Sequence, residues 1–231
     1  MPDVGSLDMR LLRVHVLEAH HRFFTAFRST TWPDIFNPSP TSDARFSPLT
    51  DQTGVVVPTL YGASTRTVAL LETALHEVNS IGARVISEKV DLRPRGLVQL
   101  HLPTRTALID LRDGELVRLG LHRSQLVSCL PVHYRCTREW AQVLHARGRI
   151  GRSVLAGAIW NSRIAELSQA DSPLLGDLLP GPNSEVFVLF GDRISTETGD
   201  YDPSERHGDL AAAGVRALLD QIAGHLGATI A

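Results

Sequence analysis

The stretch that decides the fold is ARFSPLTDQTGVVVPTLYGASTRTVALLETALHEV, residues 44–78. It begins with a loop that carries Arg45, continues as a short apolar strand that ends near Tyr61, and passes through a turn of small residues into a helix over residues 65–80. The β-branched run predicts the strand, and the apolar spacing after the turn predicts the helix, with Glu72 in its second turn. An arginine, a tyrosine and a glutamate placed in this way can converge on one anionic, aromatic ligand.

The rest of the chain predicts a mixed order of strands and helices. Strands are expected at residues 23–28, 55–61, 84–91, 96–102, 106–111, 155–160 and 184–190. Helices are expected at residues 7–26, 137–146 and 209–226, with weak helical character at 114–121. Loops are expected at residues 32–40, 176–182 and 199–208, which are rich in Gly and Pro or polar. We therefore expect one α+β domain over residues 1–231, with a mixed or antiparallel sheet.

Composition and charge exclude several classes of protein. The chain has 231 residues, 43% hydrophobic and 21% charged, which are ordinary values for a soluble globular protein. Its formal net charge of -2 gives no basic footprint for nucleic acid. Apart from Lys89 the cationic side chains are arginines, which suits bidentate phosphate binding and fits a high-GC genome equally well. The sequence shows no signal peptide and no run of about 18 apolar residues, so we expect a cytoplasmic protein without membrane contact.

Cysteine and histidine give no sign of a metal site. Cys129 and Cys136 form neither a CxxC pair nor a zinc-type Cys/His cluster, and we expect both to be reduced. The ten histidines show no spacing typical of metal ligands. Neither GxGxxG nor GxxxxGK[ST] occurs, which disfavours Rossmann and P-loop modes of nucleotide binding.

Five short motifs in order make the chain similar to the RES domain family, the toxin half of bacterial toxin–antitoxin pairs. They are FR at 27–28, ARFS at 44–47, LYGA at 60–63, VALLE at 68–72 and GAIWNSR at 157–163. The helix over residues 137–146, with Thr137 as its N-cap and Gly148 at its end, matches the central helix of the family. The resemblance covers about residues 24–190. The loop departs from the family pattern, because Ala44, Phe46 and Ser47 stand where glycine, tryptophan and asparagine are usual.

The resemblance implies a fold like that of the ADP-ribosyltransferase toxins and cleavage of the nicotinamide–ribose bond of NAD+. Similar proteins pass the ADP-ribosyl group to phosphate, to water or to a protein. The implied activity is therefore that of an NAD+ phosphorylase or glycohydrolase, with a protein ADP-ribosyltransferase as the alternative. NAD+ is then a substrate, inorganic phosphate is an optional co-substrate, and no prosthetic group is implied. The implied partner is an antitoxin with an Xre-type helix-turn-helix domain that covers the active site, and a homodimer stays open.

The resemblance implies a chemical role for each candidate side chain. Bond cleavage passes through an oxocarbenium-like state, which a nearby carboxylate stabilises, and Glu72 is the candidate. Arg28 is the second catalytic candidate, and with Arg45 it supplies guanidinium donors for the pyrophosphate. Tyr61 stacks on nicotinamide or hydrogen-bonds the ribose. Ser162 holds a phosphate or ribose hydroxyl, and no GxSxG elbow surrounds it as a nucleophile would require.

Each of these side chains also has an ordinary structural explanation. Considered alone, Glu72 is interpreted as an exposed helix residue, since glutamate is mostly exposed. An isolated arginine is interpreted as one partner of a surface ion pair. Tyr134, Arg135 and Thr137 stand near a helix start that can bind phosphate, although we expect capping there. A catalytically silent binding domain is the remaining alternative for the whole chain, because a fold does not guarantee its activity.

Overall fold

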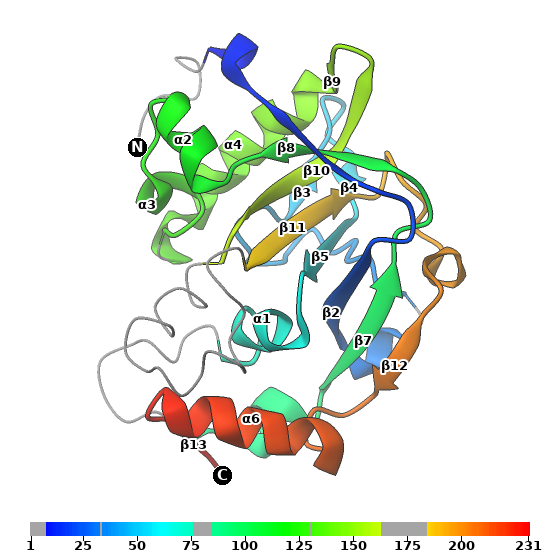
Figure 1. The fold of residues 1–231 in the computed structure, drawn as a ribbon, viewed down its shortest axis with the longest axis vertical. Coiled ribbons are helices and arrows are strands. Elements are labelled where there is room, and N and C mark those ends of the chain that lie inside the picture. Colours follow the sequence, from blue (N-terminus) through cyan, green and yellow to red (C-terminus); the bar gives the residue numbers. More distant parts are fainter. Residues whose placement is uncertain (1–7, 33, 76–84, 130, 163–183) are drawn as a thin grey trace.

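The computed structural model describes residues 8–32, 34–75, 85–129, 131–162 and 184–231. Arg163, Glu77, residues 76–80 of the helix expected at 65–80 and the loop expected at 176–182 lie outside these ranges. The described part of that helix is shorter than expected, because it ends at Leu71 with Glu72 as its C-cap. The described residues form a nine-stranded sheet (Figure 1). Its strands in spatial order are β1 (Val14–Leu17), β8 (Thr106–Asp110), β10 (Ser153–Asn161), β11 (Glu185–Phe190), β5 (Thr59–Ala63), β2 (Arg22–Arg28), β7 (Arg95–His101) and β12 (Ser204–His207), with β9 (Arg149–Ile150) beside β10.

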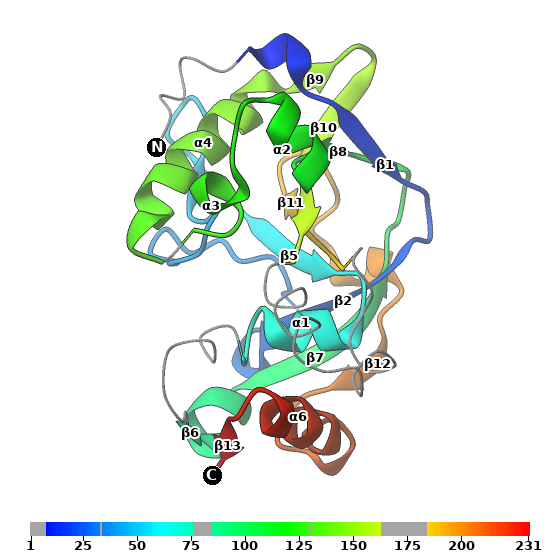
Figure 2. The same cartoon turned by 60° about the vertical axis from the view of Figure 1, so that its left-hand side comes forward.

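The sheet is mostly antiparallel, and only the β8–β10 pairing is parallel among its described strands. This confirms the predicted α+β class with a mixed sheet. Between β5 and β2 a single registered pair, Phe24 with Ala63, joins the two halves. The hydroxyl of Thr25 reinforces this junction by donating to the carbonyl oxygen of Tyr61 over 2.7 Å. Figure 2 shows the result, an upper half-sheet that ends at β5 and a lower half-sheet of β2, β7 and β12.

The two long helices cover the two half-sheets separately. The long helices are α4 (Tyr134–Arg147), against the upper half, and α6 (Ala213–His225), against the lower half (Figure 2). The short helices are α1 (Arg66–Leu71), α2 (Asp113–Arg118) and α3 (Arg123–Leu126). Two small sheets complete the fold, β3 (Leu49–Thr50) with β4 (Val56–Val57) and β6 (Val85–Ile86) with β13 (Thr229–Ile230). Helical turns lie at Met9–Leu11, Ser29–Thr31, Glu88–Leu92, Pro131–His133 and Thr198–Tyr201.

Side chains alternate between two apolar clusters on opposite faces of the sheet. Along β5, Leu60 belongs to the cluster around Phe187 and Tyr201, whereas Tyr61 and Ala63 belong to the cluster covered by the helices. This alternation follows from the two-residue period of a strand. The strands approach closely, and a Cβ on Gly62 would lie 2.4 Å from the Phe187 ring. Glycine is therefore required where β5 meets β11.

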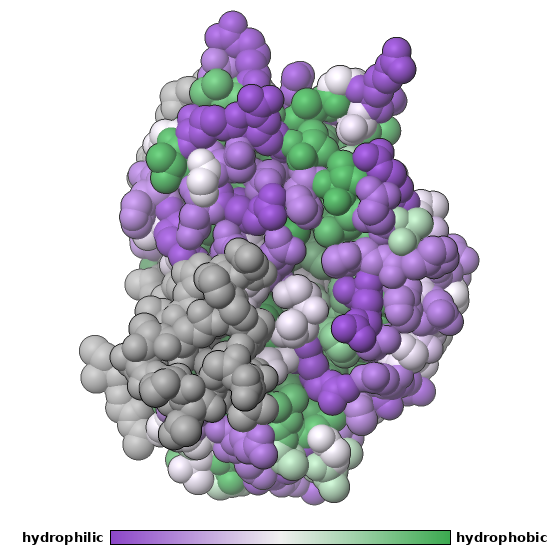
Figure 3. Space-filling model, in the orientation of Figure 1, coloured by the Kyte–Doolittle hydropathy of each residue, from purple (hydrophilic) through white to green (hydrophobic). Residues whose placement is uncertain are grey.

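The distribution of hydrophilic and hydrophobic residues on the surface is that expected from the ordinary composition of the chain. The face in Figure 3 is largely hydrophilic, with hydrophobic residues in separate patches, one of them over the strands of the upper half. Within the described ranges no helix combines the length and the apolar character needed to cross a membrane.

The prediction of a helix at residues 7–26 is wrong. This segment is a helical turn at Met9–Leu11 followed by β1 and the start of β2. His20 adopts a left-handed backbone conformation with φ 62°, which no α-helix tolerates. The alternating Val14 and Val16 then pair with β8 in a four-residue edge strand, which is too short for its period to stand out against helical spacing.

Other expected boundaries also move. The strand expected at 84–91 is limited to β6, because Ser87 caps a π-helical turn at Glu88–Leu92. The loop expected at 199–208 contains most of a helical turn and β12. The helix expected at 137–146 begins one turn earlier, so that Thr137 lies inside α4 and is not its N-cap. Its expected end is confirmed, since Gly148 follows α4 with φ 65°.

Candidate functional site

Arg45 stands at the tip of a tight turn. The backbones of Ala44 and Ser47 exchange two hydrogen bonds, of 3.0 and 3.3 Å, so that Arg45 and Phe46 are the two residues between them. The Phe46 side chain is 1% exposed, and its ring centroid lies 5.1 Å from that of Trp160. Burial of the phenylalanine fixes the turn on the sheet and thereby fixes the position of the neighbouring arginine.

The start of α4 holds Arg45 from a second direction. The Thr137 hydroxyl donates to the carbonyl oxygen of Arg45 over 2.6 Å. One turn earlier in the helix, the Tyr134 ring faces the guanidinium, with its centroid 5.5 Å from Cζ. The Nε of Arg45 is buried, and among the described residues it has no hydrogen-bond acceptor. A buried donor without an acceptor is costly, so this cation is oriented by the protein but not satisfied by it.

Tyr61 forms the floor between these groups. Its hydroxyl oxygen accepts the backbone N–H of Phe46 over 2.9 Å, and its ring packs edge-on to Trp160 with centroids 6.3 Å apart. Burial raises the pKa of Tyr61 far above its ordinary value, although the Phe46 N–H and the Arg45 charge oppose this shift. The phenol is therefore neutral at physiological pH.

Glu72 and Ser162 meet on the same side of the sheet. Thr65 caps α1 by accepting the N–H of Val68, and Glu72 is the residue that ends this helix. The fully buried Ser162 hydroxyl donates to Oε1 of Glu72 over 2.6 Å. Ser162 directly follows β10, and its own N–H donates to the carbonyl oxygen of Ser184 over 2.7 Å. The carboxylate is thus oriented by a side chain that two strands hold in place.

The cation and the carboxylate act on the same tyrosine. Burial raises the pKa of Tyr134, the Arg45 guanidinium opposes this shift, and the Glu72 carboxylate adds to it. The structure therefore joins Tyr61 to the Arg45 turn and joins Ser162 to Glu72, and Arg45 and Glu72 both influence Tyr134. The buried rings of Phe46 and Trp160 pack beside Tyr61 and the turn.

Arg28 is the predicted site residue that the structure does not connect to this cluster. It is the last residue of β2, it is exposed, and its strand neighbour is Arg95. Its carbonyl oxygen accepts the Thr31 hydroxyl over 2.8 Å. Within the described residues no hydrogen bond or ion pair joins its guanidinium to Arg45, Glu72 or Ser162. Its catalytic role stays a prediction.

Tyr134 and Thr137 are the site residues that sequence reasoning assigned to capping. Both face the Arg45 turn, because they are three residues apart on one helix and so share a face. That i, i+3 spacing of a tyrosine and a threonine was the available signal. No group of three or more His, Cys, Asp or Glu in the described ranges is arranged as a metal site. Cys129 and Cys136 are both free thiols.

The fold defines a class of protein, an α+β domain with a split, mostly antiparallel sheet, in which the Glu72 carboxylate is held by Ser162 and the half-buried Arg45 guanidinium faces Tyr134. The family model of the RES domain matches residues 10–171, and the chain belongs to this family. The matched range begins and ends earlier than the stretch of about residues 24–190 that the motifs indicated, and it confirms the resemblance.

One solved structure extends the comparison to three dimensions. A chain in the crystal structure of the MbcT–MbcA toxin–antitoxin complex of M. tuberculosis superposes with a TM-score of 0.53 at 13% sequence identity. The match covers 88% of this chain and 91% of that chain. At this identity the likeness shows a shared fold. A search of curated proteins finds no match.

Proposed function

We propose that this chain is the toxin of a toxin–antitoxin pair and that it cleaves the nicotinamide–ribose bond of NAD+. Its membership of the RES domain family and the fold it shares with a chain of a toxin–antitoxin complex support the first part. The second part rests on one observation. A carboxylate that a buried hydroxyl orients, Glu72 with Ser162, shares a site with Arg45, a cation whose buried Nε has no acceptor among the described residues.

Glu72 supplies the chemistry of the bond cleavage. Nicotinamide leaves as a neutral molecule from a cationic glycoside, so positive charge moves onto the ribose and no general acid is needed. A fixed carboxylate beside the ribose stabilises that charge without reorganisation during the reaction. The 2.6 Å hydrogen bond from Ser162 supports this role, because it fixes the orientation of the carboxylate.

Arg45 supplies the recognition of the pyrophosphate. A guanidinium offers five donors in a planar fork, which matches phosphate oxygens. The turn and the Tyr134 ring hold the fork, and the buried Nε of Arg45 has no acceptor in the described part of the chain. A phosphate oxygen can serve as that acceptor. Tyr61 offers an aromatic edge and a neutral hydroxyl that can still donate its proton to a ribose oxygen.

The ADP-ribosyl acceptor and the partner follow from the same proposal. Phosphate and water are the acceptors we favour, and a protein acceptor is the alternative. The partner is an antitoxin with a helix-turn-helix domain that covers the site. Val132 is 78% exposed and lies two residues before Tyr134, so an apolar contact point stands at the rim of the site.

The decisive experiment is to incubate the purified chain with NAD+, with and without inorganic phosphate, and to identify the products by mass spectrometry. Loss of NAD+ that requires phosphate identifies a phosphorylase, and loss without phosphate identifies a glycohydrolase. Glu72→Gln should reduce turnover by about 10²- to 10³-fold, the usual cost of removing one group that stabilises transition-state charge.

Glu139→Gln is the matched control, because Glu139 is an exposed glutamate on the outer side of α4. It should leave turnover unchanged. An NAD+ pool that stays intact with the unaltered protein contradicts the cleavage proposal. Transfer of labelled ADP-ribose to a protein would then identify the alternative activity.

A further inference from the structure

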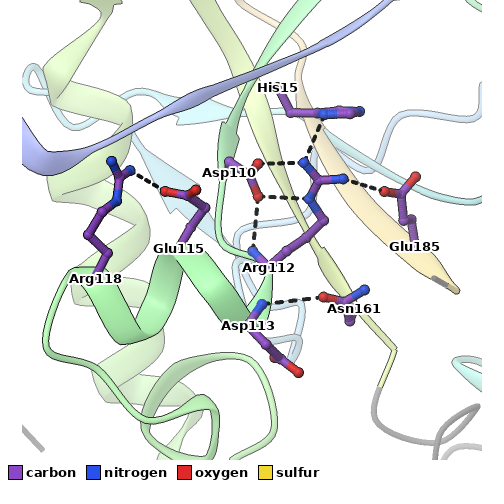
Figure 4. Close-up of polar contacts among 8 residues, drawn as sticks. All are labelled: His15, Asp110, Arg112, Asp113, Glu115, Arg118, Asn161 and Glu185. Atoms are coloured by element: carbon purple, nitrogen blue, oxygen red, sulfur yellow. Dashed lines mark hydrogen bonds and ion pairs between the residues drawn. The ribbon is translucent and has the colours of Figure 1, made fainter. Parts of the chain in front are cut away.

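Arg112 spans the end of the strand that delivers Ser162. In the sheet β10 lies between β8 and β11. The Nε and Nη2 atoms of Arg112 donate to the two carboxylate oxygens of Asp110, the last residue of β8, over 2.9 and 2.6 Å (Figure 4). Its Nη1 donates to Oε1 of Glu185, the first residue of β11, over 2.9 Å. The guanidinium therefore links the two strands that flank β10. The link lies near the end of β10, which Ser162 directly follows.

Asp110, Arg112 and Glu185 together form a clamp across β10. The clamp is partly buried. The side chains of Asp110, Glu185 and Arg112 are 7%, 19% and 32% exposed. Burial alone would raise the pKa of Asp110, but the hydrogen bonds from Arg112 bring it below its ordinary value. The remaining Nη2 proton points at Nδ1 of His15 over 3.0 Å, so that the ring nitrogen acts as the acceptor in this tautomer. These hydrogen bonds are short and charge-assisted, and they are partly shielded from solvent. Bonds of this kind fix the geometry of their partners.

The end of β10 is also held by the start of α2 and by β11. The Asp113 N–H donates to the side-chain oxygen of Asn161 over 3.3 Å, as Figure 4 shows. Asn161 is in turn the cross-strand partner of Glu185. Ser162 therefore directly follows a residue that is held by Asp113 on one side and by Glu185 on the other.

Glu185 also reaches the helix that carries the carboxylate. Its N–H donates to the Ser64 hydroxyl over 3.1 Å, and its carbonyl oxygen accepts the Ser64 N–H over 2.9 Å. Ser64 directly precedes Thr65, the N-cap of the helix that ends at Glu72. Glu185, which Arg112 holds, therefore pairs with the residue before Ser162 and contacts the residue before the N-cap of the helix that ends at Glu72.

We infer that Arg112 is a positioning residue, which acts through β10 and Glu185 to hold the Ser162 hydroxyl against the Glu72 carboxylate. Its function depends on the planar fork that spans from Asp110 to Glu185. Lysine keeps the charge but offers a single nitrogen, so Arg112→Lys should release one flank of β10 while leaving the chain folded. The inference rests on the proposed function only where turnover is measured.

The first test measures the hydrogen bond without any substrate. Unfolding is followed in denaturant for the unaltered chain, Ser162→Ala, Glu72→Gln and the double variant, each with and without Arg112→Lys. The coupling between Ser162 and Glu72 should be about tenfold or more in the unfolding equilibrium constant, as expected for a hydrogen bond to a charged group. With Arg112→Lys it should fall below about twofold, which is near the limit of additivity.

Arg118→Lys is the matched control. Arg118 forms an ion pair with Glu115 in the same neighbourhood and is 31% exposed, but it does not span β10 (Figure 4). It should leave the coupling unchanged. If Arg112→Lys fails to fold, Glu185→Gln removes one flank of the clamp and keeps the Asp110 pair, with the same expected loss. Coupling that persists in the folded variant, or that is absent from the unaltered chain, overturns the inference.

The second test uses NAD+ turnover. Arg112→Lys should lower kcat about tenfold with little change in KM, because it misplaces a group that acts in the transition state. In the Ser162→Ala background it should cause no further loss. Independent, multiplying effects would show a general structural role and contradict the inference. Absence of NAD+ cleavage by the unaltered chain would contradict the proposed function alone, because the coupling measurement needs no substrate.

Discussion

The two charged ends of the site are built in opposite ways. The carboxylate of Glu72 has a protein partner, the buried Ser162 hydroxyl at 2.6 Å. The guanidinium of Arg45 has a ring against its face, but its buried Nε lacks an acceptor within the described residues. The protein thus completes the carboxylate end by itself and leaves the cation end incomplete. Under the proposed function, the carboxylate is in place before the substrate binds, and the substrate supplies the acceptor for the cation.

The largest expected difference lies in turnover at the carboxylate end. Ser162→Ala should reduce kcat roughly tenfold, since it frees the carboxylate but does not remove it, which corresponds to about 1.4 kcal/mol of transition-state stabilisation. Glu72→Gln should cost far more, about 10²- to 10³-fold. Single-turnover measurements with NAD+ separate these effects from product release. Equal losses in both variants would mean that the serine has a direct role of its own.

The comparison also explains which parts of the site the sequence can reveal. Tyr61 and Glu72 belong to one continuous stretch, so their convergence follows from a strand, a turn and a helix. The contacts that complete the site join residues 90 apart in the chain, for Ser162 with Glu72, and 92 apart, for Thr137 with Arg45. A local pattern carries no information on such pairs, and only the family resemblance places Ser162 near the site.

The fold shows the same division. The buried strands β7, β8, β10 and β11 have strong apolar patterns, and the sequence predicts each of them within two residues. The N-terminal segment shows helical spacing although it folds as β1 and β2, because the edge strand β1 is only four residues long and because the turn between the strands depends on the left-handed conformation of His20. The π-helical turn at Glu88–Leu92 depends on the Ser87 cap and on the docking of β13, whose residues lie more than 130 positions away. Tertiary contacts decide such elements.

The second prediction concerns Arg45, whose replacement should affect the stability of the protein and its affinity for NAD+ in different ways. Arg45→Met removes a buried donor that has no acceptor among the residues the structure describes, and it keeps an apolar stem of similar length. It should leave the free energy of unfolding unchanged or raise it by up to about 1 kcal/mol. NAD+ binding should weaken roughly 10- to 100-fold, because a charge-assisted contact to phosphate is worth about 1.5–3 kcal/mol.

Arg138→Met is the control for this prediction. Arg138 lies on α4 near the same turn, but its guanidinium has a partner, Asp43 at 2.9 Å. Its removal should lower stability slightly and leave NAD+ binding intact. Denaturant unfolding measures the stability, and calorimetric titration in a Glu72→Gln background, in which turnover is slow, measures the binding. Clear destabilisation by Arg45→Met would show that the arginine has structural partners of its own.

The third prediction concerns the tyrosine between the two ends. Tyr61→Phe removes the acceptor of the Phe46 N–H and leaves that buried donor unpaired, which should lower the free energy of unfolding by about 1–3 kcal/mol. Burial raises the pKa of Tyr61, so the folded state keeps this proton more tightly than the unfolded state does. The stability from the phenol is therefore fully present below pH about 10 and decreases above it. Tyr61→Phe should flatten the alkaline part of the stability profile, and an unchanged profile would contradict this account.

The smallest expected effect separates the ring of Tyr134 from its hydroxyl. The ring faces the Arg45 guanidinium, and among the described residues no hydrogen bond to its hydroxyl accompanies that contact. Tyr134→Phe keeps the aromatic face and should leave NAD+ affinity unchanged, whereas Tyr134→Leu should weaken it about two- to fivefold, as expected for a cation–π contact of about 0.5–1 kcal/mol. Both variants should keep kcat, because the ring orients the cation and does not touch the carboxylate. A loss with phenylalanine equal to that with leucine would instead identify the hydroxyl as a ligand contact, and the cation end would then carry a second polar group that a substrate must satisfy.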